Sequence, residues 1–193
     1  MIYYYDSALT ETTQKMELQL KELLRTYNNM QSEIIILCIG SDRSTGDSLG
    51  PVTGYLLENL HIKNVYGSLR VPVHAANLSS ALELIHKRHF NPFIIAIDAS
   101  LGIPEHVGYI TLGTGPLIPG LGVQKKLPEV GDLHITGIVN TSGNGNDRLL
   151  QTTHLSIVIQ IANVLANVCS NAINACSYMP QSPDQSCPQL LTS

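Results

Sequence analysis

Two uninterrupted aliphatic segments constrain the fold of this chain more than any other feature. Residues 34–40 read IIILCIG, and residues 93–98 read FIIAID, with Asp98 as the first polar side chain. A strand with one face in water alternates apolar and polar residues, whereas a strand of a parallel sheet is covered by helices on both faces. Both segments therefore predict central strands of a covered, mostly parallel sheet.

Helical periodicity fills the intervals between the expected strands. We expect helices over residues 10–29, 52–60, 78–86 and 149–168, and shorter strands within 65–73, 107–112 and 134–139. Pro51 suits the first turn of the second helix, and Asn77 is a favourable N-cap for the third. This alternation predicts an α/β fold of three layers, a mostly parallel central sheet with helices on both faces.

Chain length and composition indicate one domain. The 193 residues match about one average domain, which we assign to residues 1–176, including an extra N-terminal helix at about 10–29. Residues 177–193 are rich in Ser, Pro and Gln, and we expect a flexible tail there.

Composition also limits the partners that we expect. The net charge is −4, Trp is absent and no run of Lys or Arg exceeds two residues, so nucleic acid is not an expected partner. No signal sequence is evident. The apolar segment 155–168 contains three polar amides and is shorter than the ~20 residues that cross a bilayer. We therefore expect a cytoplasmic protein without a membrane partner, and the low charged fraction of 13% favours a homo-oligomer.

Acidic side chains mark the exits of the two expected central strands. Asp42 and Asp47 follow the first strand, and Asp98 ends the second. Ligands of such sheets bind beyond the carboxyl ends of the strands, so Asp47 and Asp98 are candidates for one site. Two neighbouring carboxylates either share a proton, as in a pair that activates water, or bind a cation. The simpler alternatives are that Asp47 caps a helix and that Asp98 bonds only to the backbone.

A metal site at these aspartates needs a further ligand. His134 lies at the entrance of a later strand and is the first candidate, with His106 as the alternative. Two carboxylates and an imidazole suit a divalent ion. The four cysteines form no CxxC pair, so they give no indication of a zinc site.

The loop after the first strand does not match the common phosphate-binding motifs. Gly46 is followed by Asp47 where a P-loop requires Lys, and GxGxxG does not occur in the chain. Ser41, Ser44 and Ser48 are interpreted as loop-forming residues whose hydroxyls bond to nearby backbone. Nucleotide binding and serine hydrolase chemistry are therefore not expected.

Three longer motifs resemble a known family. GDSLGP within IIILCIGSDRSTGDSLGP, then FIIAIDASLG, then GPLIPGLGVQKKLPEVGDLHITGIVN resemble the YyaC family of sporulation proteins of endospore-forming bacteria. That family is similar to the spore germination protease and, more remotely, to hydrogenase maturation endopeptidases. The resemblance implies the same α/β fold.

The resemblance also implies functional residues. Asp47 and Asp98 match the two aspartates proposed as the catalytic pair of the germination protease. In hydrogenase maturation endopeptidases the matching acids hold nickel together with a histidine, for which His134 is the match here. The implied function is a sporulation-associated peptidase of the cytoplasm of the sporulating cell or spore. Its substrate would be a protein or peptide such as the small acid-soluble spore proteins, with no cofactor.

Two alternatives stay open beside the peptidase. One is a metal-binding protein of the maturation-peptidase type, holding a divalent ion such as nickel or zinc with Asp47, Asp98 and His134. The other is a non-catalytic sporulation protein for binding or assembly. In the peptidase, the Gly/Pro-rich segment 113–128 would form a wall or lid, and Arg43 would stabilise an oxyanion.

Overall fold

The computed structural model describes residues 1–28, 32–119, 127–143 and 145–177. Its elements, in chain order, are β1 (Ile2–Asp6), α1 (Thr12–Leu23), the π-helical turn η1 (Leu24–Asn28), β2 (Ile34–Cys38), α2 (Leu49–Asn59), β3 (Val65–Tyr66), α3 (Leu78–Arg88), β4 (Phe93–Gly102), the 3₁₀ turn η2 (Pro104–His106), β5 (Tyr109–Thr114), β6 (Leu133–Thr141), α4 (Asn146–Gln151) and α5 (Leu155–Ser177).

The described strands form one six-stranded sheet in the order β1-β5-β6-β4-β2-β3. Strands β6, β4, β2 and β3 are parallel to one another, whereas β5 is antiparallel to both of its neighbours, β1 and β6. The two aliphatic segments are β2 and β4, which lie side by side and each have a neighbouring strand on both sides. The predicted α/β fold with a mostly parallel sheet is confirmed, and β1 is an additional strand that the sequence did not reveal.

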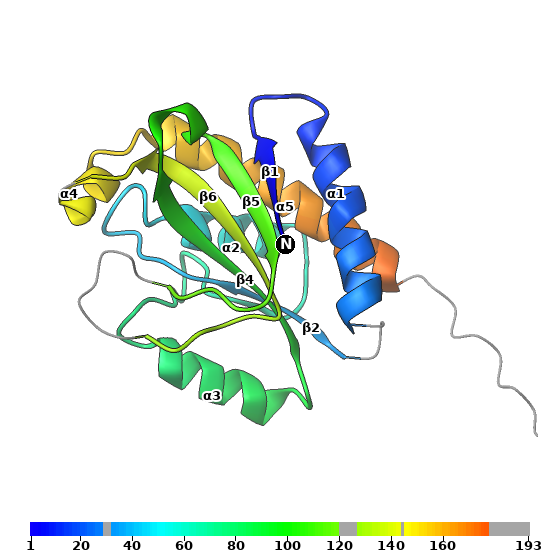
Figure 1. The fold of residues 1–193 in the computed structure, drawn as a ribbon. Helices are drawn as coiled ribbons and strands as arrows, with labels where there is room; N and C mark the ends of the chain where they lie inside the picture. The colour runs from blue at the N-terminus through cyan, green and yellow to red at the C-terminus, as the bar shows by residue number, and fades with distance from the viewer. Residues whose placement is uncertain (29–31, 120–126, 144, 178–193) are drawn as a thin grey trace, which may run out of the picture.

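Helices cover both faces of the sheet, as predicted (Figure 1). Helices α1, α2 and α5 pack on one face and enclose the larger hydrophobic core, which includes Met16, Leu57 and Ile161. Helix α3 packs alone on the other face, where Leu78 and Ile85 join a smaller core. Each fully buried aliphatic side chain contributes roughly 1.5–3 kcal/mol, so the three-helix face holds most of the stability.

The expected helix 149–168 is wrong in its bounds, because two helices occupy this part of the chain. Helix α4 ends at Gln151 and α5 begins at Leu155. The backbone carbonyl of Leu149 accepts the Asn140 amide at 2.8 Å and the Thr153 hydroxyl at 2.9 Å. These two side chains thus bind the carbonyl oxygen that would otherwise accept the next backbone N–H of α4, and α4 ends there.

Helix α5 is longer than the sequence suggested. It reaches Ser177, and among the described residues it alone is long and apolar enough to cross a bilayer by length and composition. Half of that apolar window is buried within the protein, where α5 packs between α1 and α2. The described chain therefore uses this helix as the centre of its larger core. The remainder of the expected tail, 178–193, lies outside the described residues.

Candidate functional site

The chain changes direction across the sheet at β2. The connection from β2 through α2 leads to β3 on one side, and the connection through α3 leads to β4 on the other side. Helices α2 and α3 lie on opposite faces of the sheet (Figure 1). Such a switch point leaves a crevice at the carboxyl ends of the two central strands, and ligands of open α/β sheets bind there.

A pocket of about 320 Å³ occupies this position. Its walls come from the loop after β2, the loop after β3, strand β4, and the two described ends of the segment between β5 and β6. Asp47 and Asp98 both line it. The fold thus brings together the two aspartates singled out in the sequence, although 51 residues separate them in the chain.

Asp98 lies one residue beyond the point at which β4 stops pairing with β2. The β2–β4 pairing ends at Cys38 and Ile97, and the next residue, Asp98, pairs only with Thr136 of β6. Asp98 is 7% exposed, and its Oδ1 accepts the backbone N–H of Ala99 at 2.8 Å. An acid in this place is held by a rigid strand and still faces the pocket.

Asp47 is held by a closed loop. The Ser41 N–H donates to the backbone carbonyl of Asp47 at 3.1 Å. A side chain at Gly40, where φ is +142°, would place its Cβ 2.0 Å from the same carbonyl oxygen, so this tight closure requires glycine. Ser48 occupies the N-cap position of α2, which removes the interpretation of Asp47 as the cap.

Burial raises the pKa of the Asp47 carboxyl above its ordinary value. The Ser41 N–H and the nearby charge of His74 lower it in part, but desolvation is the larger effect. A carboxyl group that holds its proton more tightly than usual, in a pocket that a second carboxyl also lines, is suited to acid–base chemistry.

His74 also lines this pocket, and sequence reasoning did not select it as a site residue. Asn77 holds its loop, since the Asn77 Oδ1 accepts the His74 N–H at 2.8 Å and the Asn77 Nδ2 donates to the Pro72 carbonyl at 3.0 Å. Asn77 occupies the N-cap position of α3, as predicted, but its side chain orders the loop and makes no cap bond to the helix. The strand that precedes it, β3, has only two residues, so no periodic pattern indicated this position.

The His74 ring is also held by the backbone. Its Nδ1 accepts the backbone N–H of Ala76 at 3.3 Å. When the ring is neutral, this bond places its proton on Nε2, which makes Nε2 a hydrogen-bond donor.

His134 does not join the two aspartates. Its ring lines a separate pocket of about 430 Å³, and its Nδ1 donates to the Gly115 carbonyl at 2.8 Å. In the sheet register His134 pairs with Ala96, which lies two residues before Asp98 along β4. The alternative candidate, His106, lines this second pocket too.

The expected metal site of Asp47, Asp98 and His134 is therefore not assembled. No group of three or more His, Cys, Asp or Glu side chains is placed to hold a metal ion within the described ranges. Residues 120–126, which lie outside the described ranges, read GLGVQKK and contain no His, Cys, Asp or Glu. The described side chains that line this pocket therefore do not form a metal site with three protein ligands.

Comparison with known proteins agrees with this architecture. Residues 2–168 match the family model described as "Protein of unknown function (DUF1256)". The chain belongs to the DUF1256 family. It is 56% identical over 135 residues to the uncharacterized protein YyaC of Bacillus subtilis (strain 168), covering 69% of this chain and 66% of that relative, just under two thirds of its length. The expected resemblance to YyaC is confirmed.

A solved structure shares the fold. The [NiFe] hydrogenase maturation protease HycI from Thermococcus kodakarensis KOD1 superposes with a TM-score of 0.53 and 15% identity. The match covers 81% of this chain and 99% of HycI. At this identity the likeness concerns the fold, and it confirms the predicted maturation-peptidase-like architecture.

The Gly/Pro-rich segment contributes a wall to the pocket that contains Asp47 and Asp98. Pro119 and Leu127 line this pocket. Nearby in the chain, Leu117 and Val130 form an antiparallel bridge. Residues 120–126 lie outside the described residues. Arg43 also lines the pocket, with its side chain exposed.

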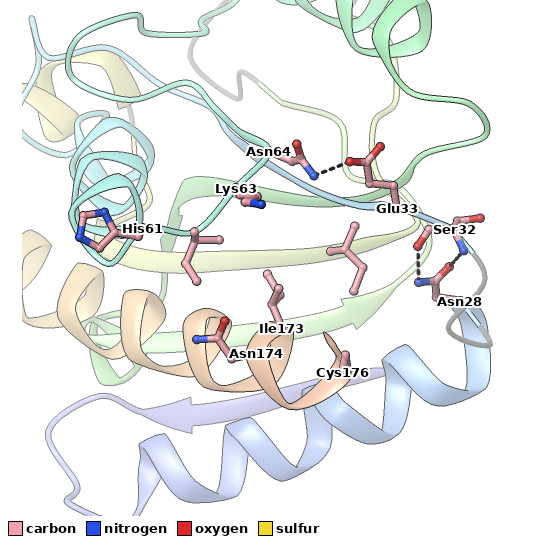
Figure 2. Close-up of a pocket in the computed structure, with 11 residues that line it drawn as sticks. Asn28, Ser32, Glu33, His61, Lys63, Asn64, Ile173, Asn174 and Cys176 are labelled. Atoms are coloured by element: carbon pink, nitrogen blue, oxygen red, sulfur yellow. Dashed lines mark hydrogen bonds between the residues drawn. The ribbon is translucent and has the colours of Figure 1, made fainter. Parts of the chain in front are cut away.

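A further cavity, of about 500 Å³, lies at the opposite edge of the sheet (Figure 2). It opens beside the start of β2, and α5 contributes Ile173, Asn174 and Cys176. Its carboxylate, Glu33, accepts the Asn64 amide at 2.8 Å and also bonds to the His89 ring at 2.6 Å. This cavity contains none of the candidate residues, and its acid is engaged in holding neighbouring loops together.

Proposed function

We propose that this DUF1256 protein is a peptidase in which Asp47 and Asp98 activate water for hydrolysis of a peptide bond. The observation that carries the proposal is the meeting of two carboxyl groups, from separate segments, in one pocket at the switch point of the sheet. The raised pKa of Asp47 and the fold shared with a maturation protease support it.

The environments of the two acids suggest different roles. Burial favours the protonated form of Asp47, so Asp47 is the proposed acid. Asp98 accepts a backbone N–H, a contact that suits an ionised carboxylate, so Asp98 is the proposed base.

In the proposed reaction each of the two carboxyl groups transfers one proton. Asp98 takes a proton from water as the water oxygen forms a bond to the peptide carbonyl carbon. Asp47 donates its proton to the leaving nitrogen as the C–N bond breaks. The products are a new carboxyl group and a new amine, and proton exchange with solvent restores the pair.

His74 completes the proposed site. Its Nε2–H is a donor beside Asp47, positioned by Asn77, and can stabilise the negative charge that develops on the carbonyl oxygen. Arg43 remains a candidate for the same role from the rim of the pocket. The metal-binding alternative receives no support from the donor set, so no step of the proposal involves a metal.

The proposal includes the biology implied by the sequence resemblance. We propose small acid-soluble spore proteins as the first protein substrates to test, in the cytoplasm of the sporulating cell or spore. The alternative of a non-catalytic binding or assembly protein is an outcome of the following experiment.

The test is digestion of a proteome-derived peptide library, with new amino termini identified by mass spectrometry. We expect the wild-type protein to generate them and the Asp98→Asn variant to do so at least ~10³-fold more slowly, because the base is lost. Asp47→Asn should lose activity as well. The control is Phe90→Ser, since Phe90 is 98% exposed and outside the pocket.

Circular dichroism and thermal melting must show that the Asp98→Asn variant is folded. Cleavage by this folded variant at the wild-type rate would exclude the proposed mechanism. Absence of cleavage by the wild-type protein, on both the library and small acid-soluble spore proteins, would favour the non-catalytic alternative.

A further inference from the structure

One half of the α3 face of the sheet carries no helix. The residues that pack with α3 come from β2 and the first half of β4, including Ile35, Leu37 and Ile94. On the same face, no helix within the described chain lies over β1, β5, β6 and the second half of β4 (Figure 1). The pocket of about 430 Å³ lies on this part of the sheet, and we refer to it as the hydroxyl groove.

The floor of the hydroxyl groove contains a row of polar side chains that leads to Asp98. In the sheet register, Tyr4 pairs with Thr111, Thr111 pairs with Thr136, and Thr136 pairs with Asp98. Paired residues of neighbouring strands project to the same face of a sheet. The proposed base is therefore the last member of a four-strand row that runs the width of the groove.

Hydroxyl groups along this row are bonded to one another. The Oγ1 atoms of Thr111 and Thr136 lie 2.7 Å apart, and the Ser100 Oγ donates to the Thr136 Oγ1 at 3.3 Å. Each hydroxyl has one donor and two acceptor positions, so these bonds leave hydrogen-bonding capacity for a ligand. The floor can thus bind amide groups without supplying a charge.

The walls of the groove are apolar and aromatic. Ile103, which is 53% exposed, and Ile138 line it. The centroid of the His106 ring lies 5.4 Å from that of the Tyr4 ring, in a tilted arrangement, and both residues line the groove. Among the described residues that line the groove there is no Lys, Arg, Asp or Glu. Such a lining disfavours phosphates and charged side chains, because their desolvation would not be compensated.

The dimensions fit an extended polypeptide. Four adjacent strands are separated by three spacings of about 4.8 Å, so the row is ~14 Å long. An extended chain advances about 3.3 Å per residue, so the row matches roughly four residues.

We propose that the hydroxyl groove binds an uncharged, extended segment of about four residues next to the scissile bond of the substrate. The assignment of the scissile bond rests on the proposed function, whereas peptide binding by the groove does not. The groove directs the substrate chain towards Asp98, and it selects segments rich in small, hydroxyl and aliphatic residues.

Fluorescence anisotropy with labelled synthetic peptides of about eight residues tests this proposal directly. Three sets are used: uncharged peptides of Ser, Thr, Val, Ala and Gln, and matched acidic and basic peptides. The protein is Asp98→Asn, which prevents turnover. We expect the uncharged set to bind at least ~10-fold more tightly than either charged set.

Two matched variants locate the binding on that background. Ile103→Arg places a charge at the wall of the groove and should weaken binding of the uncharged set by at least ~10-fold. Phe90→Arg makes the same change at a fully exposed position outside the groove and should leave binding unchanged. Equal affinity for the three sets, no binding of any set at about 1 mM, or an Ile103→Arg variant that binds normally would overturn the proposal.

The outcomes separate this proposal from the proposed function. Groove-dependent binding of peptides that the wild-type protein never cleaves would support the groove and contradict the peptidase. Cleavage of the peptide library that is insensitive to Ile103→Arg would support the peptidase and contradict the groove.

Discussion

The two faces of the central sheet are used differently, and β4 and β6 show the contrast residue by residue. Toward α1, α2 and α5 these strands direct Ile95, Ile97 and Ile135, which are fully buried. Toward the other face they direct Asp98 and Thr136, which line the two pockets described above. The first face holds the larger core, whereas the second combines the smaller core under α3 with the polar side chains of the two pockets. Because side chains alternate along a strand, neighbouring positions should separate stability from function.

Consecutive residues of β6 give the sharpest test of this contrast. Ile135→Ala should reduce the free energy of unfolding by about 2–5 kcal/mol, because it leaves a cavity in the larger core. Thr136→Val, on the opposite face, loses the bond to Thr111 and should cost about 1 kcal/mol. Urea denaturation of both variants provides the measurement. Similar losses in the two variants would mean that the faces are not divided in this way.

Asp47 should oppose stability at neutral pH, as expected of a functional acid. Its native pKa is raised above the ordinary 3.8, so the native state retains the proton to a higher pH than the unfolded state does. The stabilisation from this protonation is complete below pH 3.8 and is lost as the pH rises through the native pKa.

Asp47→Asn removes this dependence on pH. The variant should therefore be more stable than the wild-type protein at pH 7, and the two should differ little near pH 3. Urea denaturation at the two pH values checks the sign. A variant that is less stable at pH 7 would mean that the native protein favours the ionised carboxylate.

The smallest effect is expected at the amino edge of the sheet, where backbone strain has a structural cause. His61 has φ of +58° directly after the end of α2, and the Ile62 N–H bonds to the Leu57 carbonyl at 3.1 Å. This is the helix-ending position that glycine normally takes. His61→Gly should raise the melting temperature, with a gain of roughly 0.5–1 kcal/mol, and leave peptide cleavage unchanged. Reduced cleavage would show that this edge also serves the function.

The sequence was informative wherever the physics was local. Continuous aliphatic segments identified β2 and β4, and the parallel-sheet rule then placed Asp47 and Asp98 at one edge. The sequence was not informative where contacts between distant parts of the chain determine the structure. Strand β1 forms only by pairing with β5, about 100 residues later. The break between α4 and α5 depends on Asn140 of β6.

The histidines show the same limit within the site. His134 is in the predicted strand, but its distance from the aspartates depends on the register of β6 against β4, which the sequence does not specify. His74 follows a strand of only two residues, too short to give a periodic signal. The aspartate pair was therefore predictable, and its histidine neighbour was not.

The most direct test of the central claim is digestion of the peptide library in ¹⁸O-labelled water by wild-type protein and the folded Asp98→Asn variant. An aspartate pair that activates water predicts ¹⁸O in the new carboxyl termini of the wild-type digest and almost no new termini from the variant. Equal amounts of labelled termini from both proteins would contradict the account, because hydrolysis would then proceed without the proposed base.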